Sequence, residues 1–138
     1  MNKFSNIVLC VLGALIVAFE TNRMFLYFYA PTVYLDVHTT TPVVRPGEKF
    51  RLSYSVTRRR ICETNVHRFI MTADRTRLVW RDVQAGGVAD IGDAVILSDV
   101  PVPADITPGK YVLITRSFAQ CYEGSHMTTH TPVMFEVK

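Results

Sequence analysis

The sequence has 138 residues, 49% of them hydrophobic, and a formal net charge of +3. This length and composition indicate one domain and an additional apolar segment. Acidic and basic residues are interspersed and the excess charge is small, which argues against a nucleic-acid partner.

The apolar segment lies at the N-terminus, where Ile7–Phe19 contains no charged residue. Alone it would form a helix of about 20 Å, shorter than the hydrocarbon core of a bilayer at about 30 Å. Extension back to Phe4 and forward through residues 24–30 gives enough length and places aromatic rings at the interface. We therefore expect residues 1–30 to form a transmembrane helix with an interfacial aromatic segment.

This segment is either an uncleaved signal-anchor or a cleaved signal peptide. A cleavage site requires small residues at the −3 and −1 positions, and the residues after the apolar run (Phe19, Glu20 and the next two) fit poorly. We favour a retained, single-pass anchor in an inner membrane, with Lys3 inside and residues 31–138 in the periplasm or outside. Glu20 and Arg23, three residues apart, could pair on one helix face.

One of the three cysteines lies in the apolar segment and the other two lie in the polar part of the chain. Cys10 lies in the apolar run and is interpreted as a small lipid-facing or core residue. Cys62 and Cys121 lie in the polar, strand-rich part. If this part is exported, a disulfide between them is expected, whereas in a reducing cytosol both would be free thiols.

Alternating hydrophobicity predicts strands after residue 31. The clearest case is the stretch 50–57, where apolar and polar side chains alternate strictly, as in an antiparallel strand with one buried face. Seven strands are expected, around residues 33–37, 50–57, 66–71, 78–83, 94–100, 111–114 and 133–137, with residues 84–93 as a loop. The predicted core contains Phe50, Leu52, Tyr54, Val56, Leu113, Val133 and Phe135. Residues 31–138 should therefore form an all-β, two-sheet sandwich.

The stretch before the sixth strand resembles part of the immunoglobulin-like sandwiches. Asp105 and Tyr111, separated by a Pro-Gly turn, resemble the tyrosine corner, in which a phenol bonds to upstream backbone. The resemblance covers residues 33–138 and is architectural. No tryptophan lies on the third strand, and Cys121 is ten residues beyond Tyr111 rather than two. A disulfide across the core is therefore not expected.

The order of several features is similar to that in small single-anchor proteins of tailed bacteriophages, which generally have no assigned function. The features are PG-x-x-F-x-L-x-Y-x-V, an arginine-rich turn with Cys62, Arg75 with Arg77, a proline-flanked strand, PG-x-Y, Cys121 and a closing P-x-x-F-x-V. This resemblance implies a fold and a membrane location, and no activity.

No metal site is expected from the spacing of histidines and acids. Glu63 and His67, and likewise His126 and His130, are four residues apart. On a helix such pairs could share a metal. On a strand, however, four residues span about 13 Å, which is too far.

No enzyme or cofactor motif is present either. The sequence lacks G-x-S-x-G, and Ser125 beside His126 is an undiagnostic dipeptide. Gly86 and Gly87 lack the lysine and helix start of a phosphate-binding loop.

Arg58, Arg59 and Arg60 form the one charge cluster in the sequence. It is either a solvated loop end or a contact for anionic headgroups or an acidic partner. Alternating strand directions would place Cys62, Cys121 and the arginines at the pole where the first strand begins. We expect that pole to face the membrane.

Two functions remain. The first is an interaction module displayed outside an inner membrane, which binds an envelope or phage component through its loops. The second is a structural subunit of a homo-oligomer, in which the helices pack together and the sandwich forms the outer layer. Gly13 and Ala14 give the helix a small-residue patch for such packing.

Overall fold

The computed structural model describes the backbone of residues 3–138 and the side chains of residues 7–25 and 29–138. The chain divides into two compact units, residues 1–30 and residues 31–138. The first unit is helical and the second is built from strands.

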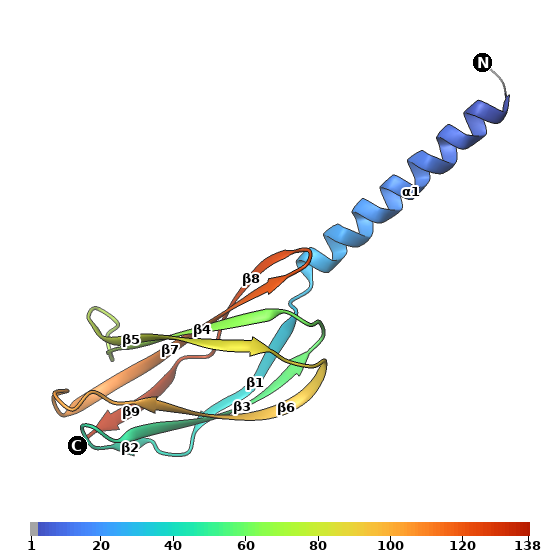
Figure 1. Ribbon diagram of the computed structural model, residues 1–138. Coiled ribbons are helices and arrows are strands. Elements are labelled where there is room, and N and C mark those ends of the chain that lie inside the picture. The colour runs from blue at the N-terminus through green and yellow to red at the C-terminus, as the bar shows by residue number, and fades with distance from the viewer. Residues whose placement is uncertain (1–2) are drawn as a thin grey trace. The chain divides into compact units, whose positions relative to one another are not determined.

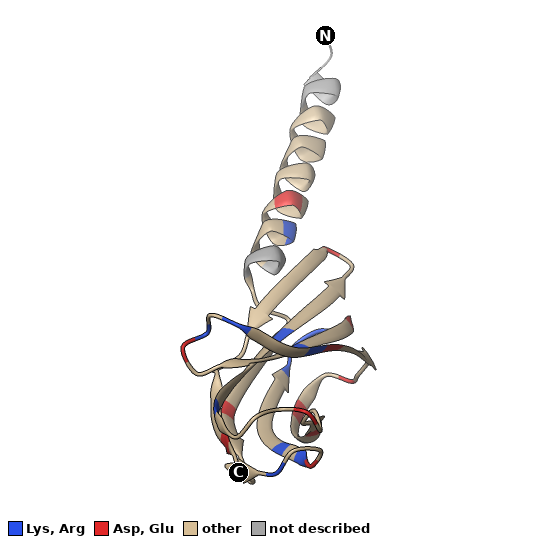
Figure 2. Cartoon of the chain, turned by 90° about the vertical axis from the view of Figure 1, so that its left-hand side faces the viewer, with Lys and Arg blue, Asp and Glu red and all other residues tan. Residues whose placement is uncertain are grey.

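Helix α1 spans Lys3–Phe28. Within it, Ile7–Phe25 has a mean hydropathy of 1.7 and is long and apolar enough to cross a membrane, a property that signal sequences share. The charged residues of this segment are Glu20 and Arg23, which form the red and blue bands on the helix in Figure 2. No ion pair joins these two side chains, so the pairing that their spacing allows is not formed.

The second unit consists of strands arranged in two sheets (Figure 1). The smaller sheet has the order β1-β3-β6, and the larger has the order β2-β9-β7-β4-β5, with β8 also paired to β7. The strands are β1 (Thr32–Thr39), β2 (Val43–Val44), β3 (Lys49–Arg58), β4 (Glu63–Thr72), β5 (Leu78–Val88), β6 (Gly92–Pro101), β7 (Gly109–Cys121), β8 (Gly124–Thr129) and β9 (Val133–Val137). All pairings are antiparallel except that of β2 with β9.

The core lies between the two sheets. Phe50 on β3 and Phe135 on β9 come from different sheets, and their ring centroids are 4.5 Å apart. The residues predicted to be buried are Phe50, Leu52, Tyr54, Val56, Leu113, Val133 and Phe135, and all are at most 9% exposed. The alternation of apolar residues therefore identified the core face correctly, because successive side chains of a strand point to opposite faces.

The expected count of seven strands is wrong, since the described residues form nine. The additional strands are β2, which has two residues, and β8, whose sequence GSHMTT is polar and lacks an apolar alternation. β8 forms because it pairs with the far end of β7 over residues 116–121. Pairing of this kind satisfies backbone groups without a buried side-chain face.

The expected loop at residues 84–93 is also largely wrong. β5 continues to Val88 and β6 begins at Gly92. Gly87 pairs with Thr64 and Ala85 with Asn65, so Gly86 is an extra residue in the ladder. The glycines therefore form a β-bulge, which bends the strand without ending it.

One charged side chain is buried between the sheets. Arg68 on β4 is 1% exposed and lies directly opposite Asp82 on β5. Its guanidinium also donates to the carbonyl oxygen of Asp99 on β6, at 3.0 Å. Arg68 thus connects the larger sheet to the smaller one.

Candidate functional site

Cys62 and Cys121 form a disulfide, with their Cα atoms 4.6 Å apart. In the antiparallel pairing of β4 with β7, Glu63 lies opposite Gln120. Cys62 and Cys121 are therefore the next pair in the same register, at the separation of about 4.5 Å typical of a non-hydrogen-bonded pair. The bond closes one end of the larger sheet and does not cross the core.

The three neighbouring arginines have different surroundings. The side chain of Arg60 forms an ion pair with Glu123, and these side chains are only 16% and 8% exposed. The backbone NH of Arg59 donates to the carbonyl oxygen of Pro31, at 2.8 Å. Arg58, at the end of β3, lines a cleft between the sheets. A common interaction loop at Arg58–Arg60 stays a prediction, and Arg60 already has an acidic partner, Glu123, within the domain.

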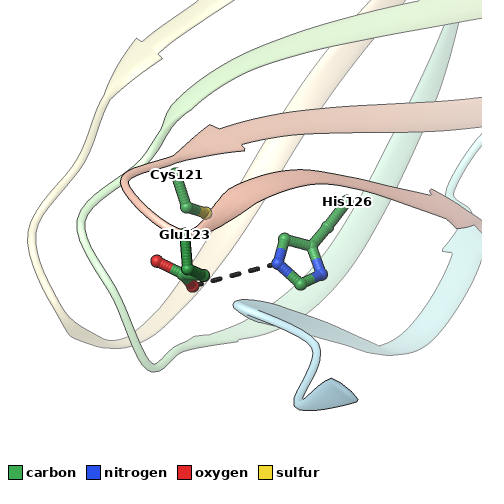
Figure 3. Close-up of side chains that lie close together, drawn as sticks. All are labelled: Cys121, Glu123 and His126. Carbon is green, nitrogen blue, oxygen red and sulfur yellow. Dashed lines mark ion pairs between the residues drawn. The ribbon is translucent and has the colours of Figure 1, made fainter. Parts of the chain in front are cut away.

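Figure 3 shows Cys121, Glu123 and His126, whose potential ligand atoms lie within 4.8 Å of one another. Zinc binding requires a thiolate at such a cysteine, but the sulfur of Cys121 is bonded to Cys62. The positive charge of Arg60 at the Glu123 carboxylate also opposes a cation. These groups therefore form a covered ion-pair network at the β7–β8 turn rather than a metal centre.

His126 shows the effect of this network. Its Nε2 lies 3.8 Å from a carboxylate oxygen of Glu123. Burial lowers the pKa of His126, and the charge of Arg60 lowers it further. The hydroxyl of the adjacent Ser125 donates to Gln120 at 2.5 Å and therefore does not donate to His126.

A second serine and histidine meet inside the domain, and no local pattern in the sequence predicts this contact. The Ser117 Oγ and the His130 Nε2 are 2.7 Å apart, and the two residues are 3% and 4% exposed. The ring of Tyr34 packs against His130 with a centroid distance of 3.8 Å. Burial lowers the pKa of His130 to about 4. Serine activation by histidine needs an accessible hydroxyl, so this buried, neutral pair is structural.

The phenol of Tyr111 bonds to upstream backbone, at Thr107 and not at Asp105. The hydroxyl of Tyr111 donates to the carbonyl oxygen of Thr107, at 2.7 Å, and lies 3.1 Å from the Thr107 Oγ1. Asp105, the residue expected beside Tyr111, is exposed and has no side-chain hydrogen bond among the described residues. The turn at Pro108 and Gly109 brings the residue four positions upstream, not six, under the phenol.

A cleft of about 240 Å³ opens between the two sheets, on the side where β5 ends the larger sheet and β6 ends the smaller one. We call it the β5–β6 cleft. Its polar side chains include Thr32, Tyr34, Tyr54, Arg58, Thr64 and Gln84. No aspartate or glutamate is among the described residues that line it. Of the three arginines that the sequence singled out, only Arg58 is among the described residues that line this cleft.

Comparisons with known proteins identify no family. No protein-family model and no curated protein matches this sequence. The domain is similar in structure to the C-terminal domain of Wzt, with a TM-score of 0.58, 15% identity, and coverage of 80% of this chain and 75% of that one. It is also similar to the DNA glycosylase AlkC of Pseudomonas fluorescens, with a TM-score of 0.53, 18% identity and 79% of this chain covered. This chain spans 31% of the AlkC chain. At these identities the similarity concerns the fold alone.

Proposed function

We propose that this protein is a membrane-anchored interaction module whose β domain lies outside the cytoplasm. The observation that carries this proposal is the disulfide between Cys62 and Cys121. Disulfides persist in oxidising compartments such as the periplasm and are rare in the cytosol. Export of the domain needs a targeting segment, and Ile7–Phe25 has the length and hydropathy for that role.

The domain would then be a member of the immunoglobulin-like sandwiches. In a constant-type immunoglobulin domain, the first, second, fourth and fifth strands share one sheet, and the third, sixth and seventh share the other. Here β1, β3 and β6 pair together, as do β4, β7 and β9. The fourth long strand, β5, departs from this pattern, because it pairs with β4 in the larger sheet and not with β6 in the smaller one. β2 and β8 are additions to the seven strands. Such domains commonly present binding surfaces on a rigid scaffold.

The resemblance of the sequence to tailed-bacteriophage proteins suggests a setting for this module. A phage-encoded domain held in the inner membrane could bind a component of the host envelope or of the phage. The genes that flank this one would indicate which role applies: early genes, lysis genes or virion genes would each point to a different one.

The location can be tested with full-length protein in a bacterial host. Ala73 is exposed in the β4–β5 turn, and an Ala73→Cys variant in a Cys10→Ser background would carry one free thiol. A membrane-impermeant maleimide should label this thiol in spheroplasts as completely as after detergent lysis. Labelling only after lysis would place the domain in the cytosol and refute the proposal.

Two controls address the helix. Alkaline carbonate should leave the wild-type protein in the membrane pellet, and its intact mass should include residues 1–30. A Leu12→Arg, Ile16→Arg variant places two charges in the apolar segment, which is costly in a bilayer, and should lose membrane association. A mature chain beginning near residue 20–30 would show cleavage instead and rule out the anchor.

A further inference from the structure

The β5–β6 cleft brings together polar groups from both sheets. Tyr34 and Tyr54 come from β1 and β3, Thr64 from β4 and Gln84 from β5. The volume of about 240 Å³ is near the lower limit of small-molecule sites, which is roughly 300 Å³. The cleft is thus large enough for a small molecule, or for one unit of a larger one.

Most polar side chains of the cleft have no hydrogen-bond partner among the described residues; the exception is Ser98, which accepts from Arg68 at 3.3 Å. Thr32, Tyr34, Tyr54, Thr64 and Gln84 form no side-chain hydrogen bond with any residue of the described chain. Polar groups in recessed positions normally pair with protein, water or ligand. Each of these five side chains can donate, so the cleft presents donors with their capacity unused.

The charge of the cleft is positive. Arg58 forms no ion pair within the described residues, in contrast to its neighbour Arg60. The nearby charge of Arg68 is balanced by Asp82, which leaves the guanidinium of Arg58 as the uncompensated charge. Burial, and secondarily the Tyr34 phenol, raise the pKa of Tyr54, so its hydroxyl remains a donor.

We infer that the β5–β6 cleft binds a small organic anion, with Arg58 holding a carboxylate or phosphate group and the surrounding hydroxyls donating to its oxygens. A guanidinium binds such oxygens through two parallel N–H bonds, which are stronger than bonds between neutral groups. Binding here is independent of the membrane location, so the two proposals are tested separately.

The test is a titration of ¹⁵N-labelled full-length protein in mild detergent, followed by amide chemical shifts. The probes are D-glucose 6-phosphate, D-glucuronate and D-glucose, which share a ring and differ in charge. Both anions should cause saturable shifts at Arg58, Thr64 and Gly86, and glucose should cause none. Equal shifts with glucose, or no saturable shift with either anion or with inorganic phosphate, would overturn the inference.

Variants locate the site. Arg58→Gln should weaken binding of the anions by about tenfold or more, the loss expected for a charged hydrogen bond. Arg45→Gln, a matched control in the exposed turn before β3, should leave binding unchanged. Tyr54→Phe and Thr64→Val remove one hydroxyl each with little change in shape and should each weaken binding several-fold. An equal loss in Arg45→Gln and Arg58→Gln would show that the attraction is non-specific and refute the assignment.

Discussion

Arg68 and Asp82 face each other on β4 and β5, and the guanidinium contacts both carboxylate oxygens. Arg68 is 1% exposed and has Trp80 within cation–π distance, at 5.8 Å. It also donates to Ser98 at 3.3 Å and to the Asp99 carbonyl at 3.0 Å. This pair therefore fixes the register of β4 with β5 and connects the sheets.

Replacing one partner of this pair should be costly. Asp82→Leu leaves the Arg68 charge buried without its counter-ion, and breaking a buried pair costs about 3–5 kcal/mol. The double variant Arg68→Met, Asp82→Leu should be more stable than Asp82→Leu, because it leaves no buried charge. Chemical unfolding of the full-length protein in detergent measures both. Arg51→Gln removes the exposed pair with Asp99 and should leave the midpoint almost unchanged. A double variant no better than Asp82→Leu would contradict the argument.

The hydroxyl of Tyr111 and its ring contribute separately to stability. Tyr111→Phe loses the bond to the Thr107 carbonyl and should cost about 1 kcal/mol. Tyr111→Ala also loses the packing against Phe135, where the ring centroids are 5.9 Å apart, and should cost about 3–5 kcal/mol. Tyr54→Ala should cost a similar amount. Tyr122 is fully exposed, so Tyr122→Ala is the control and should leave the stability almost unchanged. If Tyr111→Ala and Tyr54→Ala both had the melting temperature of the wild-type protein, the core assignment would be wrong.

The stability of the domain should depend on pH through His130. Its pKa is about 4 in the folded state and about 6.5 when unfolded. Between these values the unfolded chain binds a proton that the folded protein excludes. Stability is therefore complete above about pH 6.5 and falls as the pH decreases toward 4, by at most about 3 kcal/mol.

Unfolding at pH 7.5 and 5.0 measures this effect. His130→Gln can keep a hydrogen bond to Ser117 without titrating, and most of the pH dependence should disappear in this variant. His38→Gln is the control, because His38 is exposed and its Nδ1 contacts only the Asp36 carbonyl, at 2.8 Å. The same loss of pH dependence in both variants would assign the effect to something other than burial of His130.

The disulfide should contribute strongly to stability. It joins residues 59 apart in sequence, and closing a loop of this length is worth about 4 kcal/mol in the chain-entropy model. Cys62→Ser with Cys121→Ser should lower stability by up to about that amount, whereas Cys10→Ser should have no effect on the β domain. Denaturing thiol titration of periplasmic protein should find one free thiol, that of Cys10. Three free thiols would contradict both the bond and the proposed compartment.

The sequence by itself determined the apolar helix, the strands of the core and the cysteine pair. These features follow from local patterns: a long apolar run, alternation along a strand, and the division of the cysteines between two segments. Phe50, Leu52, Tyr54 and Val56 are buried as predicted. Alternation is sufficient here because the pleat of a strand places every second side chain on the same face.

Only the tertiary structure decided which distant residues meet. β8 has no apolar pattern and forms through pairing with β7, and Arg68 is buried because register places Asp82 opposite it. Arg58 and Arg60 are two residues apart, yet one lines the β5–β6 cleft and the other binds Glu123. Such partners are set by strand order and register, which depend on the whole sheet. No local stretch of sequence contains that information.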